Sequence, residues 1–384
     1  MHTFATVFFS VIALGWLIQG VRAWRGMASV PRLSDVKPAS GENLPCISIL
    51  VGARDEAEKM PAAVESWLAL DYPDFEIIAV DDRSQDATGK ILDDLARRDA
   101  RLKAVHVTDL PTGWLGKPHA LQTAYERSSG EWLVFTDADV RYSPDLLRRT
   151  LALAIDKKWD HLTLLAALEL RGFWEVTTVA YLGLGFALGF QPWKVSDPKS
   201  KTYFGVGAFQ LVRRSVYETI GMHRKLALEV VDDIKLAKLI KLAGFRSGLA
   251  TSQQYVQIRW HDGFLNVVRG LMKNIFAGYG FSVWNVVLSI SGVFVLSILP
   301  FIALWFTSGL TRVACAVACA VAVLVEGRFV QETNEPALYG LTHPIGAAVF
   351  IYMSLRAMIG TLWRGGIVWR GTFYPLRELR KGMV

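Results

Sequence analysis

Two carboxylates, Asp137 and Asp139, stand two residues apart directly after a strand-like run at residues 131–135. Hard divalent cations such as Mg²⁺ and Mn²⁺ take oxygen ligands and keep positions open for water or phosphate. In an extended chain both carboxylates would face the same way, and the small side chain of Ala138 would leave little between them. Like charges this close raise each other's pKa unless a cation separates them. The spacing favours a site for a divalent cation and a diphosphate, with a solvated turn as the alternative for an isolated triplet.

A second acidic pair, Asp232 and Asp233, begins a segment in which apolar residues recur at helical spacing. One interpretation is that acids in a first turn only complement the helix dipole. The other is that one carboxylate accepts the proton of an attacking hydroxyl, which is worth on the order of 10²–10⁴ in rate. The residues alone leave open which carboxylate of the pair would be this base.

Two further polar clusters follow predicted strands. Asp81 and Asp82 come directly after four apolar residues, where adjacent carboxylates need a donor-rich partner such as a nucleobase edge or a ribose hydroxyl. Ser84 and Asp86 could instead cap the next helix. Lys117 stands at the start of a predicted helix, where a diphosphate is already favoured, although a plain surface lysine is the alternative.

The elements that position these residues alternate between short apolar runs and amphipathic segments. The runs at 47–52, 76–80, 103–107 and 131–135 predict buried strands, and 57–70, 86–99 and 117–128 predict the helices between them. This alternation is typical of an α/β domain with a doubly wound, mostly parallel sheet. Such sheets bind ligands beyond the carboxyl ends of their strands, where each acidic cluster falls.

The composition indicates that the protein is associated with a membrane. Of the 384 residues, 52% are hydrophobic and 20% are charged, and the apolar residues are clustered. The net charge of +7 comes from basic residues that are scattered or flank apolar runs, as at an anionic membrane surface, so we expect no nucleic-acid partner. The three cysteines, Cys46, Cys315 and Cys319, form no disulfide framework.

The apolar segments predict the order of domains. Residues 1–22 form an uncleaved N-terminal transmembrane anchor, and the arginines that follow it place the next domain in the cytosol. A linker at 23–43 leads to the α/β domain at 44–262. An interfacial amphipathic helix at 263–283 precedes transmembrane or re-entrant segments at 284–363 and a basic tail at 364–384. We therefore expect a multi-pass protein of the cell (inner) membrane.

Two membrane questions stay open. Three full crossings after a cytosolic domain would place the basic tail outside, which the positive-inside rule disfavours, so we expect the last segment, interrupted by Arg356, to be re-entrant or interfacial. The apolar run at 173–190 lies within the α/β domain in sequence. It is either a core helix or a patch that dips into the interface to admit a lipid.

The motifs, taken in order, resemble the nucleotide-sugar glycosyltransferases of family 2, which have the GT-A fold. The resemblance runs from about residue 46 to 260 and into the tail. It is carried by GARDE at 52–56, IIAVDDRSQDAT at 77–88, GWLGKPHAL at 113–121, FTDADV at 135–140, FGVGAF at 204–209 and VDDIKLAKLIKLAGF at 231–245.

The resemblance implies a role for each matched residue. Asp137 and Asp139 would hold the divalent cation, Mg²⁺ or Mn²⁺, and Asp233 with Asp232 would be catalytic. The residues that would bind the nucleotide-sugar are Ala53, Arg54, Glu56, Asp81, Asp82, Lys117, Asp137, Ala138, Asp139, Arg259 and Trp260.

One departure indicates the branch of the family. Processive synthases carry Gln-x-x-Arg-Trp after the base, whereas this chain has Val256 in place of the glutamine. The sequence looks closer to the lipid-modifying branch, and the tail resembles carotenoid and hopanoid glycosyltransferases, with ceramide glycosyltransferases also in that branch. No role is assigned to His261, Arg370 or Tyr374.

The expected function is an inverting transfer of a sugar from a nucleotide-diphosphate-sugar to a lipid acceptor at the membrane. A polyprenyl-phosphate sugar synthase and a polysaccharide synthase are alternatives. A non-catalytic membrane scaffold with a nucleotide-binding fold is an alternative of another class. The sugar, the base and the acceptor lipid stay open, because specificity of that kind depends on pocket shape.

Overall fold

The computed structural model describes residues 2–259 and 263–384 and divides into two compact units. One, here called the sheet unit, comprises Val30–Glu169, Pro192–Trp260 and Arg377–Val384. The other, the helical unit, comprises Met1–Ser29, Leu170–Gln191 and His261–Leu376. Each unit is described by itself.

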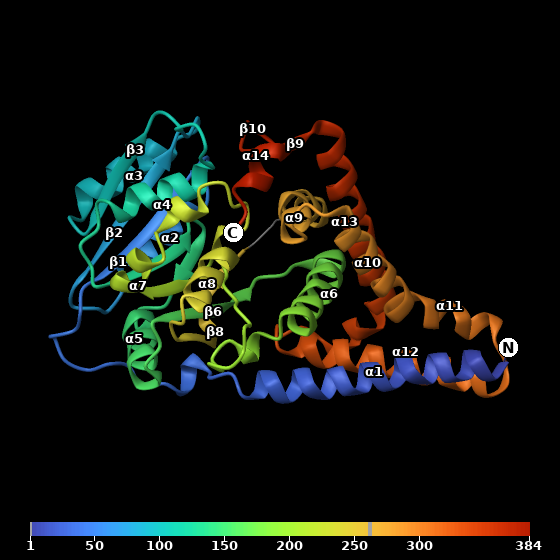
Figure 1. Ribbon diagram of the computed structural model, residues 1–384. Helices are drawn as coiled ribbons and strands as arrows, with labels where there is room; N and C mark the ends of the chain where they lie inside the picture. The colour runs from blue at the N-terminus through green and yellow to red at the C-terminus, as the bar shows by residue number, and fades with distance from the viewer. Residues whose placement is uncertain (1, 260–262) are drawn as a thin grey trace. The chain divides into compact units, whose positions relative to one another are not determined.

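The sheet unit is built on an eight-stranded sheet of order β3-β2-β1-β4-β7-β6-β8-β5 (Figure 1). Its strands are β1 (Ile47–Ala53), β2 (Phe75–Asp82), β3 (Leu102–Val107), β4 (Trp132–Asp137), β5 (Val140–Tyr142), β6 (His161–Leu168), β7 (Gln210–Arg213) and β8 (Ser247–Ile258). The four strands predicted from sequence, β1 to β4, are all parallel to one another, and β6 is parallel to β8. Strands β7 and β5 run antiparallel to their neighbours, so the sheet is mixed but mostly parallel, as expected.

Helices lie between the strands of the sheet unit along the chain. They are α2 (Met60–Leu68), α3 (Thr88–Arg98), α4 (Gly116–Tyr125), α5 (Leu146–Lys157), α7 (Arg214–Thr219) and α8 (Asp232–Leu242), with short 3₁₀ turns η1 (Leu33–Asp35), η2 (Pro192–Lys194) and η3 (His223–Leu226). Helices α2, α3 and α4 join the parallel strands β1 to β4. The three helices predicted from sequence correspond to α2, α3 and α4 and are confirmed, each a few residues shorter than expected. The last helix, α14 (Leu376–Lys381), leads into the end of the chain.

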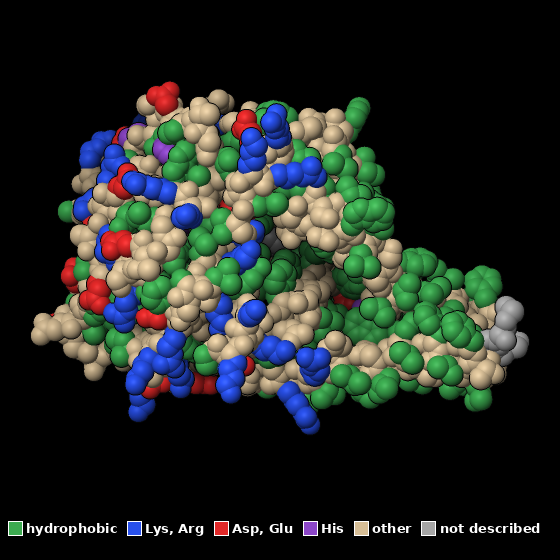
Figure 2. Space-filling model, viewed as in Figure 1, with side chains coloured by type: hydrophobic (Ala, Val, Ile, Leu, Met, Phe, Trp, Pro, Cys, Tyr) green, Lys and Arg blue, Asp and Glu red, His purple; other side chains and the backbone are tan. Residues whose placement is uncertain are grey.

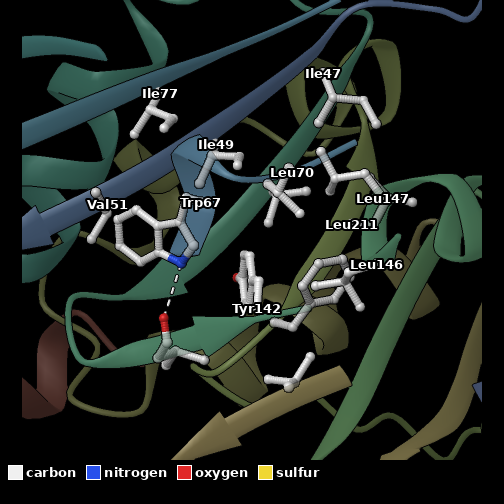
Figure 3. Packing of buried hydrophobic residues seen from close by; sticks show 14 of the residues in the cluster. Ile47, Ile49, Val51, Trp67, Leu70, Ile77, Tyr142, Leu146, Leu147 and Leu211 are labelled. Atoms are coloured by element: carbon white, nitrogen blue, oxygen red, sulfur yellow. Dashed lines mark hydrogen bonds between the residues drawn. The ribbon is translucent and has the colours of Figure 1, made fainter. Parts of the chain in front are cut away.

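The core explains why the central strands read as continuous apolar runs. Strand β1 is covered on both faces: Ile49 and Val51 belong to one buried cluster and Leu50 to another. Trp67 of α2 is fully buried, and its indole N–H donates to the Val140 carbonyl at 2.9 Å (Figure 3). This bond ties α2 to the short strand that follows the Asp137–Asp139 motif.

The register of the sheet brings the acidic clusters together. Ala53 pairs with Asp81, and Gly52 pairs with Asp137, so the ends of β1, β2 and β4 lie at one edge. Val140 of β5 pairs with Ile258 of β8, which carries the chain after residue 258 to the same region. This is the ligand-binding edge expected of such a sheet.

The helical unit contains the long apolar segments. Its elements are α1 (His2–Ala28), α6 (Gly172–Phe190), α9 (Phe264–Gly278), α10 (Val283–Val293), the π-helical turn η4 (Phe294–Ile298), α11 (Leu299–Phe306), α12 (Gly309–Gln331), the 3₁₀ turn η5 (Ala337–Thr342), α13 (His343–Arg364), and the hairpin β9 (Gly366–Trp369) and β10 (Thr372–Pro375). Five segments are long and apolar enough to cross a membrane: Thr3–Ala28, Phe173–Lys194, Val283–Phe306, Gly309–Gln331 and Ala337–Arg364. Figure 2 shows hydrophobic side chains gathered on the surface over α1, α11 and α12.

The structure bears on the predictions for the apolar run at 173–190 and for the last apolar segment. The apolar run at 173–190 forms α6, which packs with α12 and α13 of the helical unit rather than in the core of the sheet unit. Helix α13 continues unbroken through Arg356, whose guanidinium donates to the Tyr352 hydroxyl. The number of crossings, and the re-entrant course of α13, stay predictions.

Candidate active site

The Asp137–Asp139 motif lies at the end of β4, but its backbone is not the extended run that the sequence suggested. Strand β4 ends at Asp137, and Ala138 and Asp139 form a turn before β5 begins at Val140. The extended geometry was therefore wrong, because β5 leaves β4 to pair with β8. Ala138 is buried, as expected of a spacer without room around it.

Asp139 lies among like charges. Burial, with the nearby carboxylates of Asp137 and Glu56, raises the pKa of Asp139 to about 7. The opposing charge is that of Lys59, whose ammonium lies 4.0 Å from Asp139 Oδ2. A carboxylate that is costly to ionise alone is the donor that a hard divalent cation stabilises, so these oxygens fit such a cation. Among residues 2–259 and 263–384, no group of three or more His, Cys, Asp or Glu side chains is arranged to hold a metal, so protein side chains would supply only part of its coordination.

Lys117, at the start of α4, joins the two acidic pairs. Its ammonium donates to Asp137 Oδ1 at 2.6 Å and lies 3.9 Å from Asp232 Oδ1. Burial opposes its charge, but the carboxylates of Asp137, Asp232 and Asp233 outweigh that cost and raise the Lys117 pKa. The alternative of a plain surface lysine is thereby excluded.

The second acidic pair begins α8. Asp232 is buried, and Asp233 is half-buried with Oδ1 accepting from the Ile234 N–H at 2.8 Å. Burial and the neighbouring Asp232 raise the pKa of Asp233 to about 6, against the lowering effect of Lys117. A carboxyl whose pKa lies near neutral pH is suited to general-base work.

Two glycines before β7 allow the chain to approach both acidic pairs. A Cβ on Gly207 would lie 2.4 Å from Asp137 Oδ2, and one on Gly205 would lie 2.4 Å from the Asp233 carbonyl oxygen. The Gln210 side-chain amide donates to that same carbonyl at 3.3 Å. The two glycines were noted from the sequence only within the FGVGAF motif. Their part in the site depends on contacts between segments far apart in sequence.

A recess lies between Lys117 and the acidic pair of α8. Its lining residues are Lys117, Leu121, Phe135, Thr136, Gly207, Gln210, His223, Asp232, Asp233 and Leu236. Sequence analysis missed His223 and Gln210, because neither stands in a motif with a chemical signature. Gln210 is polar within an apolar run, which was a weak signal, whereas His223 is followed by Arg224 and Lys225 and had none.

Asp81 and Asp82 are each held by a neighbour. Asp81 Oδ1 accepts from the Ser84 N–H at 3.1 Å, and Oδ2 lies 3.2 Å from His106 Nδ1. Asp82 receives both Nε and Nη2 of Arg83, at 2.8 and 3.1 Å. These bonds fix the orientation of both carboxylates at the edge of the sheet where a ligand is expected.

The loop after β1 is fastened to the loop after β2. The N–H groups of Asp55, Glu56 and Ala57 donate to Ser84 Oγ, Thr88 Oγ1 and Asp86 Oδ2, at 3.0, 2.8 and 3.1 Å. Asp86 also accepts from the N–H of Thr88, the first residue of α3, whereas Ser84 bonds to the loop after β1 and does not cap the helix, whose N-cap Ala87 has no side-chain cap. Ala53 is buried at the end of β1, and Arg54 follows it with a buried Nε.

The remaining predicted residues are dispersed. Arg259 follows β8, and its guanidinium donates to the Glu169 carbonyl at 2.7 Å, while its own carbonyl accepts from Lys59. Trp260 and His261 lie outside the described residues. Arg370 and Tyr374 lie in the β9–β10 hairpin of the helical unit. Of the predicted set, Lys117, Asp137, Asp139, Asp232 and Asp233 form one charged centre with Glu56 and Lys59.

Known proteins share this framework. The chain is 33% identical over 113 residues to the beta-monoglucosyldiacylglycerol synthase of Trichormus variabilis, covering 29% of this chain and 24% of that one. It is 22% identical over 266 residues to the 4,4'-diaponeurosporenoate glycosyltransferase of Staphylococcus haemolyticus, covering 64% of this chain and 65% of the other. The alignments thus span less than two thirds of either relative.

A solved structure shares the fold. The mannosyltransferase of Pyrobaculum calidifontis, in complex with GDP-Man and Mn²⁺, matches 93% of this chain and 99% of its own with a TM-score of 0.53 and 20% identity. The likeness covers the mostly parallel sheet and the apolar helices. The model of the family described as Glycosyl transferase family 2 matches residues 48–221, which contain strands β1 to β7 and the Asp137–Asp139 motif. Residues 48–221 of the chain therefore match glycosyltransferase family 2.

Proposed function

We propose that the chain is a membrane-bound inverting glycosyltransferase, which moves a sugar from a nucleotide-diphosphate-sugar to a lipid acceptor. The observation that carries the proposal is the charged centre, in which Lys117 lies between Asp137 and Asp232. It joins a carboxylate motif suited to a metal–diphosphate to a carboxylate pair suited to a base.

Each residue has a role in the transfer. Asp137 and Asp139 would hold the divalent cation, Mg²⁺ or Mn²⁺, which when bound would supply Lewis-acid stabilisation of the charge on the leaving diphosphate. Lys117 adds a fixed positive charge at the same place. Asp81, Asp82 and the loop at Ala53, Arg54 and Glu56 bind the nucleotide, together with Arg259 and Trp260.

The bond changes follow from these positions. The acceptor oxygen attacks the anomeric carbon from the side opposite the diphosphate, and the bond between that carbon and the diphosphate oxygen breaks. Asp233 takes the acceptor's proton as the new bond forms, and the nucleoside diphosphate leaves with the bonding electrons. A single displacement of this kind inverts the anomeric carbon.

Three observations support a lipid acceptor. Five helices are long and apolar enough to cross a membrane. The amphipathic helix α9 is the form expected of an interfacial segment, and α6 adds exposed aromatics at Phe173 and Trp174. The two curated relatives carry names that refer to a diacylglycerol and to a carotenoid acid. Facing the cytosol, the site would receive its donor from water and its acceptor from the bilayer.

The test is a product analysis. Membranes containing the full chain are incubated with a panel of radiolabelled nucleotide-sugars, with and without EDTA, and the lipid extract is characterised. We expect one sugar per lipid, formed only with a divalent cation and absent from membranes containing the D233N variant. A growing chain indicates a polysaccharide synthase and a phosphate-linked sugar indicates a polyprenyl-phosphate sugar synthase. If no donor is consumed with cation present, the scaffold alternative holds.

A further inference from the structure

A histidine and a tyrosine lie behind the acidic pair. Tyr217 lies in α7 and His223 begins η3, and both are buried with exposed fractions of 0% and 1%. The Tyr217 hydroxyl lies 2.6 Å from His223 Nδ1, and the other ring nitrogen, Nε2, lies 3.7 Å from Asp232 Oδ2. The ring also packs against Phe135 at 5.1 Å between centroids.

The hydrogen bonds determine where the histidine proton resides. The Tyr217 oxygen already accepts from the His223 main-chain N–H at 3.0 Å, so its own O–H is available to donate to Nδ1. If Nδ1 carried the proton instead, the buried Tyr217 O–H could no longer donate to it. The unprotonated Nε2 would then face the Asp232 carboxylate with its lone pair, which is unfavourable. The favoured form is the neutral ring with Nε2–H directed at Asp232. Burial also lowers the His223 pKa, which keeps the ring uncharged.

The groups that face the acidic pair decide its charge. Lys117 of α4 lies 3.9 Å from Asp232 Oδ1, and His223 of η3 approaches the other oxygen. Asp233 is faced by Asp232, by Lys117 and, at longer range, by Asp137 of β4. The Lys117 ammonium and the His223 N–H lie within 4 Å of the two Asp232 oxygens, and their electrostatic attraction stabilises the form in which both carboxylates are ionised. An ionised Asp232 makes Asp233 the stronger proton acceptor.

We propose that His223 is a positioning residue, fixed by Tyr217 as its Nε2–H tautomer, which keeps Asp232 ionised beside the base Asp233. This inference rests on the proposed function for its effect on turnover. The tautomer and the ionisation of Asp232 do not depend on it.

The first test is the pH dependence of kcat in His223 variants. H223F keeps a ring but loses the donor, so the fully ionised pair becomes less stable and the acid limb of the kcat profile moves to higher pH by about half a unit or more. H223Q places an amide N–H near the position of Nε2 and should restore most of the wild-type profile. The donor KM stays within about twofold of wild type in both, because neither change touches the nucleotide.

The matched control is a tyrosine at the opposite edge of the sheet. Y217F removes the hydroxyl that fixes the tautomer, and Y72F removes the hydroxyl that donates to the Pro45 carbonyl at 2.6 Å. Both remove the hydroxyl of a buried tyrosine, with two hydrogen bonds lost in Y217F and one in Y72F, but only Y217F should shift the acid limb. Equal shifts in the two variants, or unchanged profiles in Y217F and H223F, overturn the proposal.

A spectroscopic readout separates this inference from the proposed function. Nitrogen NMR of histidine-labelled protein in bilayers, with the signal assigned by its loss in H223Q, should show a neutral Nε2–H ring at pH 7. Y217F should convert part of it to the other tautomer. A protonated ring, or an Nδ1–H ring in the wild type, contradicts the proposal even if sugar transfer is observed. If no sugar is transferred, the predicted NMR result still upholds the His223 arrangement and only the function falls.

Discussion

The two edges of one sheet treat a buried carboxylate in opposite ways. At the edge where β1 and β2 begin, Glu76 is buried at a cost, but donors from Lys103, Ser129 and Ser48 outweigh that cost and lower its pKa to about 2. At the edge where β1, β2 and β4 end, burial and like charges raise the pKa of Asp139 to about 7 and that of Asp233 to about 6. At the first edge, protein donors compensate the charge of the carboxylate. At the second edge, the carboxylates would be stabilised by a bound cation or a proton. A carboxylate thus indicates function when its environment leaves its charge uncompensated.

The largest effect is expected when Asp233, at the second edge, is replaced by a neutral residue of the same shape. D233N should lower kcat by roughly 10²–10⁴, because it removes the proton acceptor, while nucleotide binding and thermal stability stay near wild type. Single-turnover kinetics and nucleotide titration measure the two effects. Turnover close to wild type would exclude Asp233 as the base.

The same isosteric change at the other edge should have the opposite outcome. The fall in the Glu76 pKa from 4.5 to about 2 corresponds to about 3 kcal/mol of stability at neutral pH, which E76Q should largely lose. Because the folded pKa is the lower one, this contribution is present above about pH 4.5 and disappears as the pH falls towards 2. Denaturant unfolding from pH 7 to 3 measures it. A gap between wild type and E76Q that stays constant with pH contradicts the assignment.

Gly207 tests how closely the second edge is packed. An alanine there would place its Cβ 2.4 Å from Asp137 Oδ2, and moving that carboxylate by an ångström should cost on the order of 10² in turnover. G185A in α6 is the control, since nothing lies within 4 Å of its Cβ position. If the two variants keep equal activity, the approach of Gly207 to Asp137 is not functional.

The smallest effect should come from the exposed partner of Glu76. Lys103 donates to Glu76 Oε2 at 2.6 Å, but its side chain is 52% exposed, so K103M should cost no more than about 1 kcal/mol and leave turnover unchanged. Thermal unfolding and donor turnover measured on the same preparation check both parts. A loss as large as that of E76Q would show that Lys103, rather than Ser48 and Ser129, holds the carboxylate.

The sequence predicted what local patterns determine. The alternation of apolar runs and amphipathic segments gave β1 to β4 and α2 to α4, and the order of acidic motifs gave the family. The turn at Ala138 and Asp139 was not foreseen, because β5 follows the register of β8, more than 100 residues away. For the same reason His223 was missed: only the packing of η3 against α8 brings its ring to Asp232. Nothing in the sequence of the apolar run at α6 indicates whether it belongs to the sheet unit or to the helical unit.

The fastened loops after β1 and β2 bear on how fast and how tightly a donor binds. Three main-chain donors at residues 55–57 are satisfied within the protein, by Ser84, Thr88 and Asp86. A nucleotide that binds there does not have to order these segments. The conformational entropy that a flexible loop usually loses when it closes on a ligand is here lost during folding. Donor association at this edge should therefore follow a single fast phase without a slow conformational step.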